Sequence, residues 1–272
     1  MARKALQHRI AILLAVLLFV VPAARAQVDP ALEARLQKLD SAFTPEVFRD
    51  VLPYRLFAPE TSGDNERYPL VIYLHGSGGI GTDNRKNFEG GNILGSRIWA
   101  LPENQAKHPC FIIVPQAPSL MNAWTSEIGD RLVELLEELA ETRPIDRARI
   151  YITGQSLGGI GTWQLVSKHP ALFAAALPLC GLARPDDATA YANSGTAIWA
   201  FHGAKDPVIP VSGTRAGSEL AGSRTIIEAI RTAGGVPRYT EYREVGHGVW
   251  EHAYIEPELI EWLFAQHRPA TD

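Results

Sequence analysis

Apolar and polar positions along the chain follow two periods, one typical of strands and the other of helices. Runs rich in β-branched and aromatic residues predict strands at 50–59, 69–76, 110–116, 148–154, 173–181, 196–203 and 238–245. The central runs are apolar at nearly every position, which is the pattern of strands covered by helices on both faces. We therefore expect a sheet that is buried between two layers of helices.

Segments with a 3.6-residue apolar period lie between several of these runs. Helices are predicted at 128–141, 224–235 and 257–267, and the first carries an apolar stripe of Ile128, Leu132, Leu135, Leu136 and Leu139. Strands and helices that alternate in this way indicate the α/β class, with a mostly parallel, doubly wound sheet. Residues 30–43 also have helical spacing, so 27–47 are expected to form a helical lead-in within a single domain covering 27–272.

The first 26 residues have the pattern of a secretory signal peptide. Arg3, Lys4 and Arg9 precede an uncharged apolar run at 10–21, and Ala24-Arg25-Ala26 offers a cleavage site. A membrane anchor is the alternative, but the run is shorter than the roughly 20 residues that span a bilayer. We expect a secreted or periplasmic protein with no membrane attachment in its mature form.

Charge and cysteine content narrow the function classes. The net charge is −4, and no Lys/Arg-rich run provides an electrostatic footprint for nucleic acid or acidic membranes. Cys110 begins one predicted strand and Cys180 ends another, so in a parallel sheet they lie at opposite ends of their strands. Two buried free thiols are expected rather than a disulfide.

A glycine-flanked serine follows the predicted strand at 148–154. Gly154, Ser156 and Gly158 form G-x-S-x-G between a strand and a helical pattern, the context of a nucleophile elbow. Glycine is needed on both sides because the turn is tight, and a Gly-rich packing turn is the alternative reading. The serine would present its Oγ at the carboxyl edge of the sheet, with the N–H of Leu157 placed to stabilise an oxyanion.

A serine nucleophile needs a base and a carboxylate that orients it, and the chain order typical of such an elbow is nucleophile, acid, base. Asp206 lies in the loop after the strand at 196–203, and His247 follows the last strand-like run with glycines on both sides. We predict that these are the acid and the base. Weaker alternatives are Asp186 and Asp187 for the acid and His252 for the base.

The stretch "YLHGSGGIG" at 73–81 contains G-x-G-x-x-G, but it is not expected to bind a dinucleotide. No helical pattern opens at Gly81, and no acidic residue ends a strand at the required distance. The loop is better suited to supply a second oxyanion donor, with the N–H of Ser77 first and that of Gly78 second. The chain has no H-E-x-x-H or C-x-x-C motif, so neither a metal nor a cofactor is expected.

Over residues 52–266 the chain resembles the α/β-hydrolase superfamily, in a branch of secreted predicted peptidases and carboxylesterases. These are related to feruloyl esterases, polyhydroxybutyrate depolymerases and the prolyl oligopeptidase catalytic domain. The resemblance rests on "LPYRLFAPE", "YITGQSLGGIGTW", "FHGAKDPVIPV" and "YTEYREVGHGVW". It implies the α/β-hydrolase fold and the triad Ser156, Asp206 and His247. Two departures bear on substrate preference: Gly79-Ile80 replaces a common Glu-Arg pair, and 212–222 resembles an insertion.

These features together predict a serine hydrolase that cleaves small-molecule or polymer-attached carboxylic esters through an acyl-enzyme. A peptidase with the same triad is the nearest alternative, and a non-catalytic binding protein on the same fold is a more distant one. Trp124 and Trp250, with Trp163, are candidates to line the substrate cleft, with core packing as the competing interpretation.

Overall fold

The computed structural model describes residues 28–60, 66–120, 123–124, 127–213 and 219–268. The signal-peptide prediction, and part of the expected insertion at 212–222, lie outside these residues. Among the described helices, none is long and apolar enough to cross a membrane.

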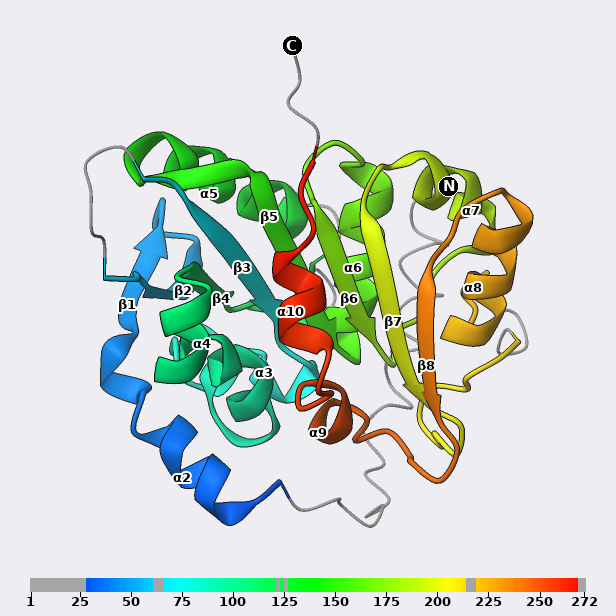
Figure 1. Ribbon diagram of the computed structural model, residues 1–272, viewed down its shortest axis with the longest axis horizontal. Helices are drawn as coiled ribbons and strands as arrows, with labels where there is room; N and C mark the ends of the chain where they lie inside the picture. The colour runs from blue at the N-terminus through cyan, green and yellow to red at the C-terminus, as the bar shows by residue number, and fades with distance from the viewer. Residues whose placement is uncertain (1–27, 61–65, 121–122, 125–126, 214–218, 269–272) are drawn as a thin grey trace.

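The described strands form one sheet in the order β1-β2-β4-β3-β5-β6-β7-β8 (Figure 1). From β4 onward neighbouring strands are parallel, whereas β2 pairs antiparallel with both β4 and β1. This confirms the expected α/β-hydrolase fold with a mostly parallel sheet. The strands are β1 (Thr44–Phe48), β2 (Leu52–Phe57), β3 (Tyr68–Leu74), β4 (Phe111–Pro115), β5 (Ile145–Gln155), β6 (Ala175–Leu179), β7 (Ala197–Gly203) and β8 (Arg238–Tyr242).

Helices cover both faces of the sheet (Figure 1). One face carries α5 (Glu127–Thr142), α6 (Leu157–Lys168), α7 (Ala188–Asn193) and α8 (Ser223–Thr232). The other carries α2 (Pro30–Gln37), α3 (Ile93–Arg97), α4 (Pro102–Lys107), α9 (Trp250–Ala253) and α10 (Leu259–Phe264).

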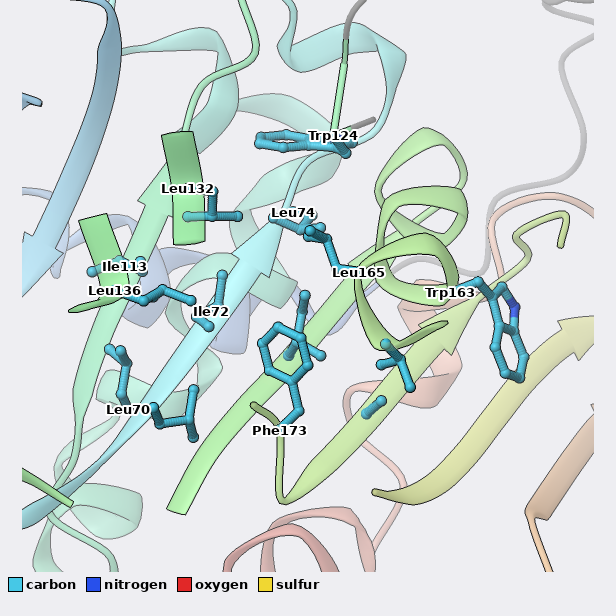
Figure 2. Packing of buried hydrophobic residues seen from close by; sticks show 14 of the residues in the cluster. Leu70, Ile72, Leu74, Ile113, Trp124, Leu132, Leu136, Trp163, Leu165 and Phe173 are labelled. Carbon is cyan, nitrogen blue, oxygen red and sulfur yellow. The ribbon is translucent and has the colours of Figure 1, made fainter. Parts of the chain in front are cut away.

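A hydrophobic core lies on each face of the sheet, and this explains why the central strands are apolar at nearly every position. In β3, Leu70, Ile72 and Leu74 point into the core under α5 and α6, while Val71 and Tyr73 point into the opposite core. Figure 2 shows the first of these cores, where Leu132 and Leu136 of α5 and Leu165 of α6 lie over the strands. All five residues of the stripe predicted on α5 are buried.

The lead-in differs from the prediction of a helical segment at 27–47. Helix α2 ends at Gln37, a 3-10 turn covers Asp40–Ala42, and the chain then enters the sheet as the edge strand β1. Only Phe48 is buried in β1, and Pro45 fits because an edge strand leaves some N–H groups unpaired. A short strand with few buried residues lacks the apolar signal by which the other strands were recognised.

Cys110 and Cys180 are both free and buried, as expected. Cys110 precedes β4 and Cys180 follows β6, and both β3 and β5 lie between those two strands.

Candidate active site

Ser156 occupies a strained turn between β5 and α6. Its φ of 55° and ψ of −114° lie outside the usual regions for a residue with a side chain. A Cβ atom at Gly158 would lie 1.9 Å from the carbonyl oxygen of Leu74, and one at Gly154 would lie 2.5 Å from that of Gly158. Glycine at both positions therefore allows α6 to pack closely enough to hold the turn.

The structure brings Ser156, His247 and Asp206 together at the carboxyl ends of β5, β8 and β7. The Nε2 atom of His247 lies 2.9 Å from Ser156 Oγ, and its Nδ1 atom lies 2.7 Å from Asp206 Oδ2. Both distances are within hydrogen-bond range. The imidazole can therefore accept a proton from the serine while the carboxylate holds its other nitrogen.

Several donors surround the Asp206 carboxylate, whose side chain is inaccessible to solvent. Backbone N–H groups of Val208 and Ile209 donate to Oδ1 at 2.8 and 2.9 Å, and His202 Nε2 lies 3.4 Å from Oδ2. Burial raises the pKa of this carboxyl, but the hydrogen bonds from His202, His247 and the backbone outweigh burial and hold its pKa well below the ordinary value. The carboxylate is thus kept ionised beside the imidazole.

His202 is a contact of Asp206 that the sequence pattern did not indicate. Its ring is fully buried, with Nε2 3.1 Å from the Ile209 carbonyl and Nδ1 2.8 Å from Ser223 Oγ. Because a carbonyl oxygen only accepts, Nε2 carries a proton and presents it towards both Ile209 and Asp206. Its position at the end of β7, before Gly203, was visible in the sequence, but its partners lie in the irregular loop that follows β7 and at the start of α8.

The two predicted oxyanion donors lie at the starts of helical segments, where backbone N–H groups have no acceptor within the segment. Leu157 is the first residue of α6, where helical N–H groups lack intrahelical partners, and Ser77 begins a 3-10 turn at Ser77–Gly79. Within the described part of the chain, neither N–H has an acceptor within hydrogen-bond distance. Both donors are therefore available to a ligand.

His75 and Trp124 support the loop that carries Ser77. His75 is fully buried; its Nε2 accepts from the Ala117 N–H at 3.0 Å, and its Nδ1 lies 2.6 Å from the Gly76 carbonyl, to which it donates. Burial lowers the pKa of His75 to about 4, which favours this neutral form. Trp124 donates from Nε1 to the His75 carbonyl at 3.3 Å.

Of the three tryptophans considered for the cleft lining, two are buried and one is partly exposed. Trp124 is only 1% exposed, so the expectation that it contacts substrate is wrong: it packs against Gly161 and His75. Figure 2 shows it among the buried residues of the core under α5 and α6. Trp163 packs against Tyr191 in the core. Trp250 is partly exposed, and its ring lies perpendicular to that of His247 with centroids 5.5 Å apart, so it remains a candidate for the lining.

A buried polar network links the serine turn to the loop that carries Ser77. Asn92 accepts from the Gly76 N–H at 3.3 Å, and the Tyr73 hydroxyl lies 3.0 Å from the same Asn92 oxygen. That hydroxyl also lies 2.9 Å from Oε1 of Gln155, the residue before Ser156. Sequence reasoning missed Asn92 because it lies in an irregular segment with no motif around it.

Cys180, Asp206 and His247 have potential metal-ligand atoms within 4.8 Å of one another. Two of the three groups are hydrogen-bonded to each other, and burial raises the pKa of the Cys180 thiol, which disfavours the thiolate that binds metals. The donor set fits a metal poorly, and the absence of metal and cofactor stays a prediction.

Comparison with known proteins shows that the chain is similar to esterases. Residues 49–212 match a family described as "Putative esterase", a range that contains Ser156 and Asp206 but not His247. The chain is 26% identical over 141 residues to poly(3-hydroxyalkanoate) depolymerase C of Paucimonas lemoignei. It is 28% identical over 174 residues to a probable feruloyl esterase C of Aspergillus terreus. These alignments cover 47% and 62% of this chain.

A solved structure of a thermostable esterase is also similar, with 34% identity and a TM-score of 0.75 over 85% of this chain. The chain spans 31% of the length of the depolymerase, 58% of the feruloyl esterase and 64% of the thermostable esterase.

Proposed function

The chain belongs to this esterase family, and from that premise we propose that it is a serine hydrolase that cleaves carboxylic esters through an acyl-enzyme. The observation that carries the proposal is the pair of distances at His247, 2.9 Å to Ser156 Oγ and 2.7 Å to Asp206 Oδ2. The esterase names of its relatives support the same reaction class.

Acylation begins when His247 takes the Ser156 proton and Oγ attacks the ester carbonyl carbon. The carbonyl oxygen becomes an oxyanion that accepts from the N–H groups of Leu157 and Ser77, each worth roughly 3–4 kcal/mol in the transition state. Asp206 stabilises the imidazolium. His247 then gives its proton to the leaving alkoxide, and an alcohol departs.

Deacylation repeats these steps with water. His247 removes a proton from a water molecule that attacks the acyl-enzyme, and the same two N–H groups hold the second oxyanion. His247 then returns the proton to Ser156 Oγ, which restores the enzyme and releases the carboxylic acid.

A comparison of the protein with its Ser156→Ala variant tests the proposal. Both are assayed on p-nitrophenyl esters of graded acyl length, a feruloyl ester and an aminoacyl anilide. We expect ester turnover that the substitution lowers by about 10³-fold or more, because the covalent route is lost. Full ester turnover in Ser156→Ala would contradict the mechanism, and anilide turnover equal to ester turnover would favour the peptidase alternative.

We also propose a secreted or periplasmic location, supported by the basic, apolar and small-residue regions in 1–26. Expression in a bacterial host, followed by fractionation and mass measurement, tests this. The expected product is outside the cytoplasm and begins at Gln27. A cytoplasmic product that retains Met1 or Ala2 would contradict it.

A further inference from the structure

Gly76, the residue before the oxyanion donor Ser77, has both of its backbone polar groups held by buried side chains. Its N–H donates to Asn92 Oδ1 at 3.3 Å, and its carbonyl accepts from His75 Nδ1 at 2.6 Å. The carbonyl of Gly76 and the N–H of Ser77 belong to one planar trans peptide unit, in which they point in opposite directions. The bonds to Gly76 therefore set the direction of the Ser77 N–H.

The orientation of the Asn92 amide is fixed by the groups around it. Its Nδ2 donates to the Lys86 carbonyl at 2.9 Å, and because a carbonyl oxygen only accepts, the nitrogen has to lie on that side. The oxygen Oδ1 is therefore left to face the Gly76 N–H and the Tyr73 hydroxyl, which lies 3.0 Å away. Asn92 is buried, so these bonds form away from bulk water.

Gln155 has the same arrangement on the side of the serine turn. Its Nε2 donates to the Gly91 carbonyl at 3.0 Å, so its Oε1 faces the same Tyr73 hydroxyl at 2.9 Å. Burial raises the pKa of Tyr73 well above its ordinary value, so the hydroxyl keeps its one proton. Tyr73 can donate that proton to Asn92 or to Gln155, and it thereby joins the serine turn to the support of the Ser77 loop.

The two oxyanion donors of the proposed reaction lie at the ends of this network. Ser77 directly follows Gly76, and Leu157 is two residues after Gln155. Both N–H groups stabilise one oxyanion only if they point at the same place. Resting on the proposed function, we propose that Asn92 is a positioning residue for this reaction: through Gly76 it aims the Ser77 N–H at the oxyanion.

Asn92→Leu removes the acceptor and leaves an apolar side chain of similar size. We expect kcat on p-nitrophenyl acetate to fall by about 10- to 100-fold, because a donor that is misplaced loses much of its effect in the transition state. KM should stay within about twofold, since the oxyanion forms only in that state. Asn92→Asp keeps an oxygen that accepts from Gly76, so its kcat should recover to within about fivefold of the unchanged protein.

Asn87→Leu is the matched control. Asn87 is a fully buried asparagine in the same segment before α3, and its Nδ2 donates to the Val114 carbonyl at 2.7 Å. Loss of that bond should lower the free energy of unfolding, as in Asn92→Leu, while kcat stays within about twofold. Urea unfolding and steady-state kinetics on both variants separate a loss of stability from a loss of positioning.

Ser77→Pro shows whether Asn92 acts through the Ser77 N–H, which proline lacks. Ser77 is the first residue of a 3-10 turn, and Gly76 has the extended conformation that suits a residue before proline, with φ −73° and ψ −179°. We expect kcat to fall by about 10²-fold or more. Adding Asn92→Leu to Ser77→Pro should lower kcat by less than about threefold, because the group that Asn92 aims is already absent.

Tyr73→Phe is a milder change in the same network. It removes the shared proton but leaves the bond from Gly76 to Asn92, so kcat should fall by about two- to tenfold. This fall should also vanish in the Ser77→Pro background. If Asn92→Leu does not fold, Tyr73→Phe takes its place in the comparison with Ser77→Pro.

The outcomes separate the positioning role from the proposed function. If no ester shows Ser156-dependent hydrolysis, the proposed function fails and the positioning role with it. If hydrolysis depends on Ser156, equal kcat values in Asn92→Leu and Asn87→Leu would overturn the positioning role alone. Full additivity with Ser77→Pro, a loss confined to KM, or Asn92→Asp no more active than Asn92→Leu would overturn it as well.

Discussion

At the scale of single residues, the sequence indicated the three proposed catalytic side chains that the structure brings together, but not the residues that contact them. Ser156, Asp206 and His247 each lie just after a recognisable strand, so chain order and motif context were enough to select them. His202 contacts Asp206 four residues further along the chain, across the turn that follows β7, and Asn92 accepts from Gly76 across an irregular segment. Such contacts depend on the final packing, for which no local pattern exists.

The His202 contact leads to a prediction about catalysis. His202→Asn removes the imidazole donor beside Asp206 while the backbone donors of Val208 and Ile209 remain. Hydrogen bonds to charged groups contribute about 1.5–3 kcal/mol, so kcat is expected to fall about 10- to 100-fold. KM should change little, because His202 is buried and does not reach the substrate. Steady-state kinetics on one p-nitrophenyl ester gives both values.

The same substitution at His108 is the control. This histidine precedes β4 at the end of the sheet opposite to the site, where it pairs with Glu261. A fall in kcat that is equal in the two variants, or a His202→Asn effect confined to KM, would contradict a positioning role for His202.

At the scale of elements, prediction succeeded where burial gives a regular pattern. The stripe on α5 and the continuous apolar runs of β3 to β7 were recognisable because one or both faces are buried. Strand β1 was missed because it lies at the edge of the sheet, is mostly exposed and contains a proline. The short helices α3 and α9 could not be predicted either, because helices of five and four residues are too short to show a 3.6-residue apolar period.

Close contact between α6 and β3 leads to a prediction about stability. In Gly158→Ala the new Cβ would lie 1.9 Å from the Leu74 carbonyl oxygen, and the nearest atoms belong to the backbone of the strand end. Because backbone yields less readily than a side chain, we expect the free energy of unfolding to fall by about 1–3 kcal/mol or more. Urea unfolding, followed by circular dichroism, measures the change.

Gly78→Ala provides the matched comparison for stability. Its Cβ would have no atom within 4 Å, so its free energy of unfolding should stay close to that of the unchanged protein. Equal unfolding midpoints for the two alanine variants would show that α6 can shift away from β3 at little cost.

At the scale of the whole molecule, the burial of His75 makes stability depend on pH. Burial lowers the pKa of His75 from 6.5 to about 4. Between those values the unfolded chain binds a proton at this residue and the folded protein does not, so stability falls as pH falls from 6.5 to 4. The pKa of Asp206 is also lowered, so its contribution is present above its ordinary value of 3.8 and is lost only at more acidic pH.

The contribution of His75 to the pH dependence of stability can be measured in a variant that lacks this imidazole. A fall in the pKa of His75 from 6.5 to about 4 corresponds to a loss of about 3 kcal/mol in the free energy of unfolding as pH falls from 6.5 to 4. In His75→Gln the free energy of unfolding at pH 7 should be lower, because the bonds to Gly76 and Ala117 are weakened, but it should decline less between pH 6.5 and 4.5. Some decline should remain, since burial also lowers the pKa of His169. Urea unfolding at pH 7.0, 6.0, 5.0 and 4.5 gives both slopes, and parallel slopes for the two proteins would mean that His75 is not the group that couples acid to unfolding.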